Sequence, residues 1–327
     1  MKKTILRICS VLITLALTFT GSSALGYILR PTNTDGTYLR VREYHNLPEN
    51  LLEVVVYGSS HAFKGVNVRT LYENYGIGAY DYGFNWQKIN TTRLFIEDSL
   101  KSQNPKVVVI ESFMAHLLRA NTNITGEIFY TRYLGDSPGR RRYLKQCFGL
   151  NPERWLSYYL PICAFHENWE NLEKNSFRSL LDPKVVERYY MGFKGTDHIK
   201  AVTLGDPATF QQKEFDKNAL AELDAIVDLC HERNIEIVFM TIPYEGEYMY
   251  ADAMEKYAQE HGCAYINLFE HVEEIGLNPE TDFSDKGHVN TEGATKVADY
   301  LGAYLKQHYE LTDMRTIENN PWEMAMS

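Results

Sequence analysis

Two short motifs at opposite ends of the sequence carry side chains suited to nucleophilic chemistry. In the first, Ser60 ends a Gly-Ser-Ser motif that directly follows the apolar run Val54–Tyr57. In the second, Asp285 and His288 stand three positions apart, shortly before a helix-like stretch. A serine hydroxyl is a weak nucleophile at neutral pH, and it needs an adjacent base that a third group holds in place. Ser60, His288 and Asp285 together supply the members of a Ser-His-Asp triad, in which the aspartate orients the imidazole.

The segments between these motifs alternate between strand and helix patterns. Short apolar runs predict five strands, at residues 54–57, 79–82, 107–110, 235–241 and 264–268. Apolar residues at helical spacing predict helices at residues 67–76, 89–100, 220–230 and 254–261, and a closing helix over 294–305 that Asn290 or Thr291 caps. This alternation is typical of an α/β fold with about five parallel strands and helices on both faces. The carboxyl ends of parallel strands share one edge, so the sheet would bring Ser60 and His288 together.

The N-terminal segment has the composition of a membrane-crossing or signal sequence. After a start that carries three basic residues, residues 8–29 form an uncharged stretch of 22 residues, about the length that spans a bilayer core. Basic residues on the short side predict a cytoplasmic N-terminus and an external C-terminal domain. Small residues at 22–24 also suit signal cleavage and secretion. Because residues 25–29 prolong the apolar run, we favour an uncleaved anchor over residues 1–30.

The rest of the chain divides by its composition. Residues 112–213, approximately, lose the strand–helix alternation and are rich in Tyr, Trp, Phe and Arg. We interpret them as a mostly helical insertion over the carboxyl edge of the sheet, where ligands bind in open α/β folds. His166 and Trp169 are its candidate substrate-binding residues, although ordinary packing explains them as well; a Trp face suits a sugar ring. The expected plan is a linker over 31–50, an α/β domain over 51–310 with this insertion, and a tail over 311–327.

Composition also argues against several classes of function. The chain has 327 residues, a net charge of -10 and a pI near 5.5, and it lacks a long basic stripe, so nucleic acid is an unlikely ligand on charge grounds. It has no Cys-x-x-Cys or His-x-x-x-His spacing and no Walker or Rossmann glycine pattern, so we expect neither a metal nor a cofactor. Cys147 and Cys163 could form a disulfide outside the cell, and the sequence leaves this open.

The two end motifs make the chain resemble the SGNH, or GDSL-type, hydrolase family. The first family motif is Gly-Asp-Ser, and Gly58–Ser60 matches it with Ser in place of Asp. The third position is the nucleophile, so the resemblance assigns this role to Ser60 and not to Ser59. The last family motif is Asp-x-x-His, which Asp285 and His288 match. The resemblance covers roughly residues 52–308, and it implies a three-layer flavodoxin-like fold.

The middle motifs of the family fit less well. The resemblance implies an oxyanion hole formed by the N–H of Ser60, the N–H of a glycine after the second strand, which Gly83 matches, and an asparagine after the third strand. There the chain reads Glu-Ser-Phe over 111–113, so the asparagine is missing from its usual place. Asn85 or Gln87 could replace it, but Asn85 could equally cap the next helix. One lost oxyanion donor lowers the rate by roughly a hundredfold or more.

The same resemblance implies a function at the cell surface. A membrane-anchored branch of the family, similar to the D-alanyl-lipoteichoic-acid and exopolysaccharide acylation proteins, shares the anchor, the Gly-Ser-Ser motif and a large insertion. This implies a serine esterase or O-acyltransferase at the plasma membrane, with an acylated cell-surface glycan or teichoic-acid-like polymer and a membrane acyl-donor protein as partners. His61 would then either touch the substrate or pack at the start of a helix. The alternatives are a catalytically weak or inactive assembly or binding component of a polysaccharide modification or export system, and a hydrolase of small lipid esters.

Overall fold

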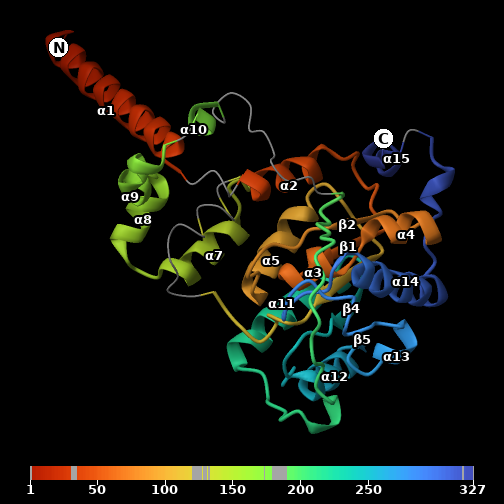
Figure 1. The fold of residues 1–327 in the computed structure, drawn as a ribbon. Coiled ribbons are helices and arrows are strands. Elements are labelled where there is room, and N and C mark those ends of the chain that lie inside the picture. Colours follow the sequence, from red (N-terminus) through yellow and green to blue (C-terminus); the bar gives the residue numbers. More distant parts are fainter. Residues whose placement is uncertain are drawn as a thin grey trace. The chain divides into compact units, whose positions relative to one another are not determined.

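The computed structural model describes residues 2–30, 35–119, 127, 131, 133–172, 174–178, 190–318 and 320–326. The chain forms two compact units (Figure 1). One unit, here the α1 unit, comprises Met1–Leu39 and Ala120–Glu187. The other, here the sheet unit, comprises Arg40–Arg119 and Arg188–Ser327 and contains all the strands of the described residues.

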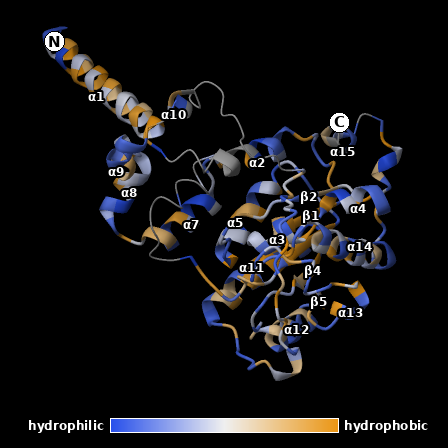
Figure 2. Ribbon diagram, in the orientation of Figure 1, coloured by the Kyte–Doolittle hydropathy of each residue, from blue (hydrophilic) through white to orange (hydrophobic). Residues whose placement is uncertain are grey.

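A five-stranded parallel sheet forms the centre of the sheet unit. Its strands are β1 (Val54–Tyr57), β2 (Ala79–Asp81), β3 (Val107–Glu111), β4 (Glu236–Thr241) and β5 (Ala264–Asn267), in the order β2-β1-β3-β4-β5. Every pair of neighbouring strands is parallel. The strands are mainly apolar (Figure 2), although β2 ends at Asp81 and β3 at Glu111, and β1, β2 and β3 are buried at every position, because helices cover both faces. The expected α/β fold with about five parallel strands is confirmed.

Two helical layers enclose this sheet. One consists of α5 (Ile89–Ser99), α11 (Lys217–His231) and α12 (Ala251–Glu260); α5 packs on α11, and the Tyr257 hydroxyl joins α12 to Asp224 of α11 at 2.9 Å. The other consists of α3 (Ser60–Gly65), α4 (Val68–Tyr75) and α14 (Thr291–His308), with α14 packed on both partners. The predicted caps hold: Asn67 accepts the N–H of Arg69 at the start of α4, and Asn290 accepts that of Gly293 in α14. Short elements η3 (Pro207–Thr209) and α13 (Val272–Ile275) complete the loops.

Part of the segment expected to be a linker, residues 31–50, forms a helix instead. This helix is α2 (Asp35–Asn46), and from Arg40 onwards it belongs to the sheet unit. Tyr44 is completely buried, and its ring stacks on that of Tyr82 with centroids 4.4 Å apart. Val41 is the other buried apolar residue among the described side chains of this mostly polar helix, and two such positions do not make an apolar stripe that the sequence would reveal.

The segment expected to be a tail, residues 311–327, also packs on the sheet unit. It contains η4 (Met314–Thr316) and α15 (Pro321–Met326). Trp322 of α15 is completely buried, stacks on Tyr72 and donates its indole N–H to the carbonyl of Ala79 at 2.9 Å. On the same edge strand, the N–H of Asp81 donates to the carbonyl of Met191 at 2.8 Å. The burial of one large aromatic, which sequence cannot foresee, ties this segment to the sheet.

The α1 unit contains one long apolar helix and several short ones. Helix α1 (Lys2–Ile28) is long and apolar enough to cross a membrane, which fits either a single-pass anchor or a signal sequence. Its partner is α9 (Ile162–Phe165): a Cβ on Gly26 would lie 2.3 Å from the backbone nitrogen of Ile162, so this contact needs glycine. The other described elements are α7 (Pro138–Phe148), α8 (Pro152–Tyr159), η2 (His166–Asn171) and α10 (Lys174–Arg178).

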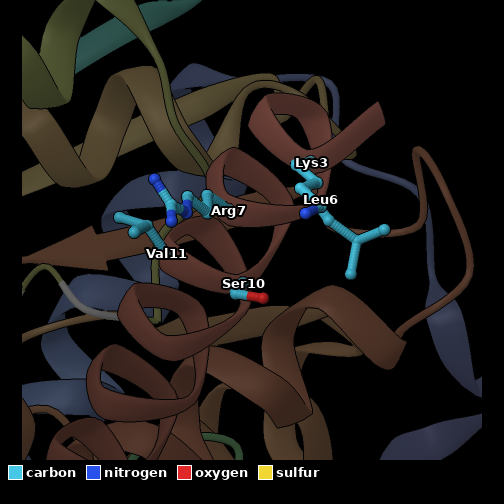
Figure 3. A pocket seen from close by; sticks show the side chains of 5 residues that line it. All are labelled: Lys3, Leu6, Arg7, Ser10 and Val11. Carbon is cyan, nitrogen blue, oxygen red and sulfur yellow. The ribbon is translucent and has the colours of Figure 1, made fainter. Parts of the chain in front are cut away.

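Two further described features of the α1 unit are a surface hollow on α1 and two cysteines. The hollow in Figure 3 is lined by Lys3, Leu6, Arg7, Ser10 and Val11, which all belong to α1 and are exposed. The side of a single helix does not enclose a ligand, so we assign it no binding role. Cys147 is buried and Cys163 is exposed, and both are free thiols in this structure.

Candidate active site

The nucleophile candidate Ser60 lies in a tight turn between β1 and α3. Gly58 has φ 150°, and a Cβ there would lie 2.7 Å from the Cβ of Glu111, so the turn requires glycine. Ser59 is the N-cap of α3, and its hydroxyl accepts the N–H of His61 at 3.3 Å. Ser60 is therefore the first residue of α3 and half-buried, and its backbone N–H has no hydrogen-bond partner among the described residues.

The structure brings the three predicted triad residues together. The Nε2 atom of His288 lies 2.7 Å from the Oγ atom of Ser60. The Nδ1 atom of His288 lies 2.9 Å from each carboxylate oxygen of Asp285. The loop before α14 fixes this geometry, because the N–H of Gly287 donates to Asp285 Oδ1 at 2.8 Å and the N–H of Ser284 donates to the His288 carbonyl at 2.9 Å.

Burial and hydrogen bonding set the protonation states of these side chains. Burial lowers the pKa of His288 below its usual value, although the bond to Asp285 works in the opposite direction. Burial alone would raise the pKa of Asp285, but the bonds from His288 and the Gly287 N–H outweigh it, so the pKa is lowered. At neutral pH the pair is therefore a neutral imidazole beside a carboxylate. This arrangement can accept the Ser60 proton and stabilise the imidazolium that results.

His61 packs beside this group. It is buried, and its ring stacks on Phe113 with centroids 3.9 Å apart and lies 5.1 Å from the ring of His288. Burial lowers the pKa of His61 to about 3, and the electrostatic interaction with His288 lowers it further, so His61 stays uncharged at neutral pH. Of the two interpretations of His61, packing at the start of a helix is the one that its position in α3 supports. A contact with substrate stays a prediction.

Gly83 lies where an oxyanion donor was expected, but its N–H is already bonded. It donates to Asp81 Oδ1 at 2.9 Å, while the Gly83 carbonyl accepts a hydrogen bond from Arg40 Nη1. The loop adjoins the nucleophile turn, because the N–H of Phe84 donates to the Gly58 carbonyl at 3.1 Å. Asp81 is completely buried, and burial raises its pKa well above the usual range. Gly83 can reach an oxyanion only if its N–H leaves Asp81.

The other two candidates for the missing donor lie in the same loop. Asn85 is exposed, in a turn three residues before the N-cap of α5, which is Lys88. The interpretation of Asn85 as the cap of that helix is therefore wrong; the turn at Trp86, which has φ 55°, separates it from the helix start. Gln87 is buried and donates its amide to Thr92 Oγ1 at 3.2 Å. The role of Asn85 as an oxyanion donor stays a prediction.

Three buried ionisable residues around this site, Glu111, Asp81 and Arg40, were not predicted as part of it. Glu111 ends β3 in place of the expected motif; it accepts the N–H of Phe113 at 2.9 Å and the hydroxyl of Ser59 at 3.3 Å. Burial raises the pKa of Glu111 to about 8. An acidic residue at the end of an apolar strand was a usable signal for Glu111 and Asp81. Nothing in the local sequence marked Arg40, whose partners come from other elements.

The pKa of Glu111 predicts how stability depends on pH. Because folding raises this pKa from about 4.5 to about 8, the folded protein keeps a proton that the unfolded chain has lost between these values. The contribution of Glu111 to the free energy of unfolding is therefore largest below pH 4.5. It falls by about 1.4 kcal/mol per pH unit between there and about pH 8. A Glu111→Gln variant, which resembles the protonated acid, should lose this slope. Thermal unfolding midpoints of both proteins at pH 5, 6.5 and 8 would measure it; parallel curves would contradict the assignment.

The two remaining candidates for substrate binding come from another part of the sequence. His166 and Trp169 belong to η2 of the α1 unit, and both are exposed. Their role in substrate binding stays a prediction. Among the described residues, no group of three or more His, Cys, Asp or Glu side chains could hold a metal ion.

Comparison with known proteins finds similarity only among solved structures. No family model and no curated protein matches the sequence. A proposed acylhydrolase from Bacteroides fragilis NCTC 9343 is 10% identical, with 82% of this chain and 94% of that chain covered and a TM-score of 0.40. A GDSL-like lipase from Bacteroides thetaiotaomicron VPI-5482 is 11% identical, with 84% and 100% covered and a TM-score of 0.39. Such similarity carries no conclusion about activity. What makes this chain resemble SGNH/GDSL-type hydrolases is its parallel sheet and the arrangement of Ser60, His288 and Asp285 at one end of it.

Proposed function

We propose that this chain is a serine-dependent ester hydrolase or O-acyltransferase of the SGNH/GDSL type. The observation that carries this proposal is the 2.7 Å contact between Ser60 Oγ and His288 Nε2, with Asp285 at 2.9 Å on the opposite ring nitrogen. These are hydrogen-bonding distances for a nucleophile, its base and the group that orients the base.

The first half of the reaction forms an acyl-enzyme. His288 Nε2 takes the Ser60 proton while Oγ attacks the ester carbonyl carbon and forms a C–O bond. The carbonyl electrons move to the oxygen, which becomes the oxyanion of a tetrahedral intermediate. When this intermediate collapses, the bond to the alcohol oxygen breaks and His288 gives its proton to that oxygen. Asp285 stays ionised and stabilises the imidazolium throughout.

The second half resolves the acyl-enzyme. A water, or a hydroxyl of an acceptor, gives its proton to His288 and attacks the acyl carbon. The bond to Ser60 Oγ then breaks, and His288 returns the proton to the serine. Water as the attacking group makes the protein an esterase, and a sugar or polyol hydroxyl makes it an acyltransferase.

Two backbone N–H groups are candidates to donate to the oxyanion, and they differ in whether they already have a hydrogen-bond partner. The Ser60 N–H has no partner among the described residues, whereas the Gly83 N–H is bonded to Asp81. Since removing one oxyanion donor lowers the rate by roughly 10²–10³-fold, we expect slow hydrolysis of simple esters unless substrate binding frees the Gly83 N–H.

The anchor-like helix supports a location for the reaction. Helix α1 would hold the protein in the plasma membrane by a single pass, with basic residues at its N-terminus on the cytoplasmic side and the sheet unit outside. There the substrate would be an ester of a cell-surface glycopolymer, and a membrane protein would supply the acyl group. Signal cleavage would instead release the chain beyond the cleaved segment as a secreted enzyme.

One sequence difference and one hydrogen bond favour a second candidate function. Glu111 stands in place of the third-strand asparagine motif, and Asp81 occupies the Gly83 N–H. Both reduce the number of oxyanion donors, so the protein could act as a weakly active or inactive assembly component of a polysaccharide modification or export system.

A comparison of hydrolysis with transfer tests these proposals. The full chain would be incubated with p-nitrophenyl acetate, with and without glycan fragments, beside a Ser60→Ala variant. We expect p-nitrophenol release that depends on Ser60; acetylated glycan would identify a transferase, and free acetate alone an esterase. Equal rates for the two folded proteins would contradict enzymatic function and favour the assembly component.

A further inference from the structure

A pocket of about 380 Å³ lies beside the triad, within the sheet unit. Its walls come from the loops that follow β3 and β4, so it opens at the same edge of the sheet as Ser60, which follows β1. Phe113 and Tyr244 belong to its lining, and the rings of both contact His61, with centroids 3.9 and 5.3 Å away. The ring of His61 in turn lies 5.1 Å from that of His288, so the rings of Phe113 and Tyr244 and then the ring of His61 connect the pocket to the triad.

The lining of this pocket is apolar inside and charged only at its mouth. Its inner surface is formed by aromatic and thioether or aliphatic side chains: Phe113, Met114, Leu117, Tyr244, Tyr248 and Met249. Two of the three lining tyrosines donate their hydroxyls within the protein, Tyr244 to the Glu247 carbonyl at 2.8 Å and Tyr248 to the Ser112 carbonyl at 3.1 Å. Both charged residues of the lining, Lys213 and Glu247, are exposed.

His116 does not alter this apolar character. Its ring also lines the pocket and stacks on Tyr250, with centroids 4.1 Å apart. Burial lowers the pKa of His116 to about 4, so the ring is uncharged at neutral pH. A ligand inside therefore meets ring faces and edges, sulfur and methyl groups, which suit a hydrocarbon chain better than a hydroxylated sugar.

We propose that this pocket binds the acyl chain of the substrate and selects a medium-length chain of about six to ten carbons. A volume near 380 Å³ holds roughly a dozen groups the size of a water or a methylene, at ~30 Å³ each. This inference rests on the proposed function, because it assumes that Ser60 forms the acyl-enzyme. An acetyl group would leave the pocket empty.

The difference in polarity between the alcohol part and the acyl part of the ester decides which part enters the pocket. The alcohol half of a glycopolymer ester carries hydroxyl groups, and burying them without partners is unfavourable. The acyl half is the part of such a substrate that can lose its water without losing hydrogen bonds. The Phe113–Tyr244 wall would guide it from Ser60 into the pocket.

Chain-length profiles of the full chain in lipid nanodiscs would test the proposal. The acyl series consists of p-nitrophenyl esters from two to ten carbons, and the alcohol series consists of acetates of alcohols with the same lengths. Leu117→Trp fills the pocket, Leu117→Ala enlarges it, and Leu118→Trp is the matched control, since Leu118 is not among the lining residues. Ser60→Ala gives the background.

The wild-type kcat/KM should rise along the acyl series by up to about fourfold per buried methylene until the pocket is full, and it should stay flat along the alcohol series. Leu117→Trp should lower kcat/KM for octanoyl esters at least about tenfold while leaving that for acetyl esters within about threefold of wild type. Leu117→Ala should move the optimum to longer acyl chains. Leu118→Trp should change neither the rate for octanoyl esters nor the optimal chain length. Activity that depends on Ser60 but has a flat acyl profile, or a rise along the alcohol series, would overturn the pocket assignment alone. No Ser60-dependent activity on any ester would overturn the proposed function with it.

Discussion

A Ser60→Ala variant will fail to react with a fluorophosphonate probe and will lose ester hydrolysis by roughly 10⁴–10⁶-fold, the range seen when a nucleophilic serine is removed from a triad. The reason is that Ser60 Oγ is the hydroxyl within hydrogen-bonding distance of His288 Nε2. In-gel fluorescence after probe labelling measures the first effect, and p-nitrophenyl acetate hydrolysis measures the second. The variant should fold normally, because Ser60 is half-buried and only a hydroxyl is lost.

The neighbouring serine provides the matched control. The hydroxyl of Ser59 points to Glu111 and to the N–H of His61, away from the base, and Ser59 is almost completely buried. Ser59→Ala should therefore keep probe labelling and lower stability by about 1 kcal/mol, as expected for the loss of an N-cap. Labelling that survives in Ser60→Ala but disappears in Ser59→Ala would reverse the assignment of the nucleophile.

An Arg40→Met variant should lose at least about tenfold in kcat and several degrees in melting temperature. The guanidinium of Arg40 lies over the rings of Phe63 and Phe84, at 4.8 and 4.2 Å, and donates to the Gly83 carbonyl. Removing it leaves a buried carbonyl without this donor, at a cost of about 1–3 kcal/mol. It also removes the positive charge near Asp81, which lowers the pKa of that carboxyl. Both effects would displace the loop beside the nucleophile.

Arg42→Met, in the same helix, is the control, since Arg42 is exposed and the charge change is identical. It should stay within about 0.5 kcal/mol of wild type. Melting temperatures and the rate constant for fluorophosphonate labelling would be measured for both variants. An Arg40→Met protein that melts earlier but labels at the wild-type rate would show that Arg40 supports the fold without positioning the site.

Local pattern was sufficient for the sheet and for the ends of several helices. The run Val54–Tyr57 is β1 as predicted, because a short apolar run rich in β-branched valine favours a strand that is covered on both faces. Asn67 and Gly76 delimit α4 as predicted, since capping and a left-handed φ of 66° are properties of single residues. The proximity of Ser60 to His288 followed from the parallel topology together with the two motifs.

Properties that depend on which side chains meet in the folded chain could not be predicted from local sequence patterns. The burial of Arg40 depends on two phenylalanine rings and a glycine carbonyl that lie more than 20 positions away in the sequence. The occupation of the Gly83 N–H depends on the rotamer of Asp81, which sequence does not specify. The role of Asn85 was ambiguous for the same reason: a polar residue before a helix can cap it only if the helix starts nearby, and α5 starts after Lys88.

The C-terminal segment affects whether the edge of the sheet can pair with another molecule. Strand β2 is at the end of the sheet, and the open side of an edge strand is a template on which a strand of another molecule can add. Here the indole of Trp322 occupies the Ala79 carbonyl, and Met191 occupies the Asp81 N–H. Trp322 and Met191 thus shield this edge of the sheet against pairing with another molecule, and we expect that removal of the segment that holds Trp322 would expose the Ala79 carbonyl and favour self-association.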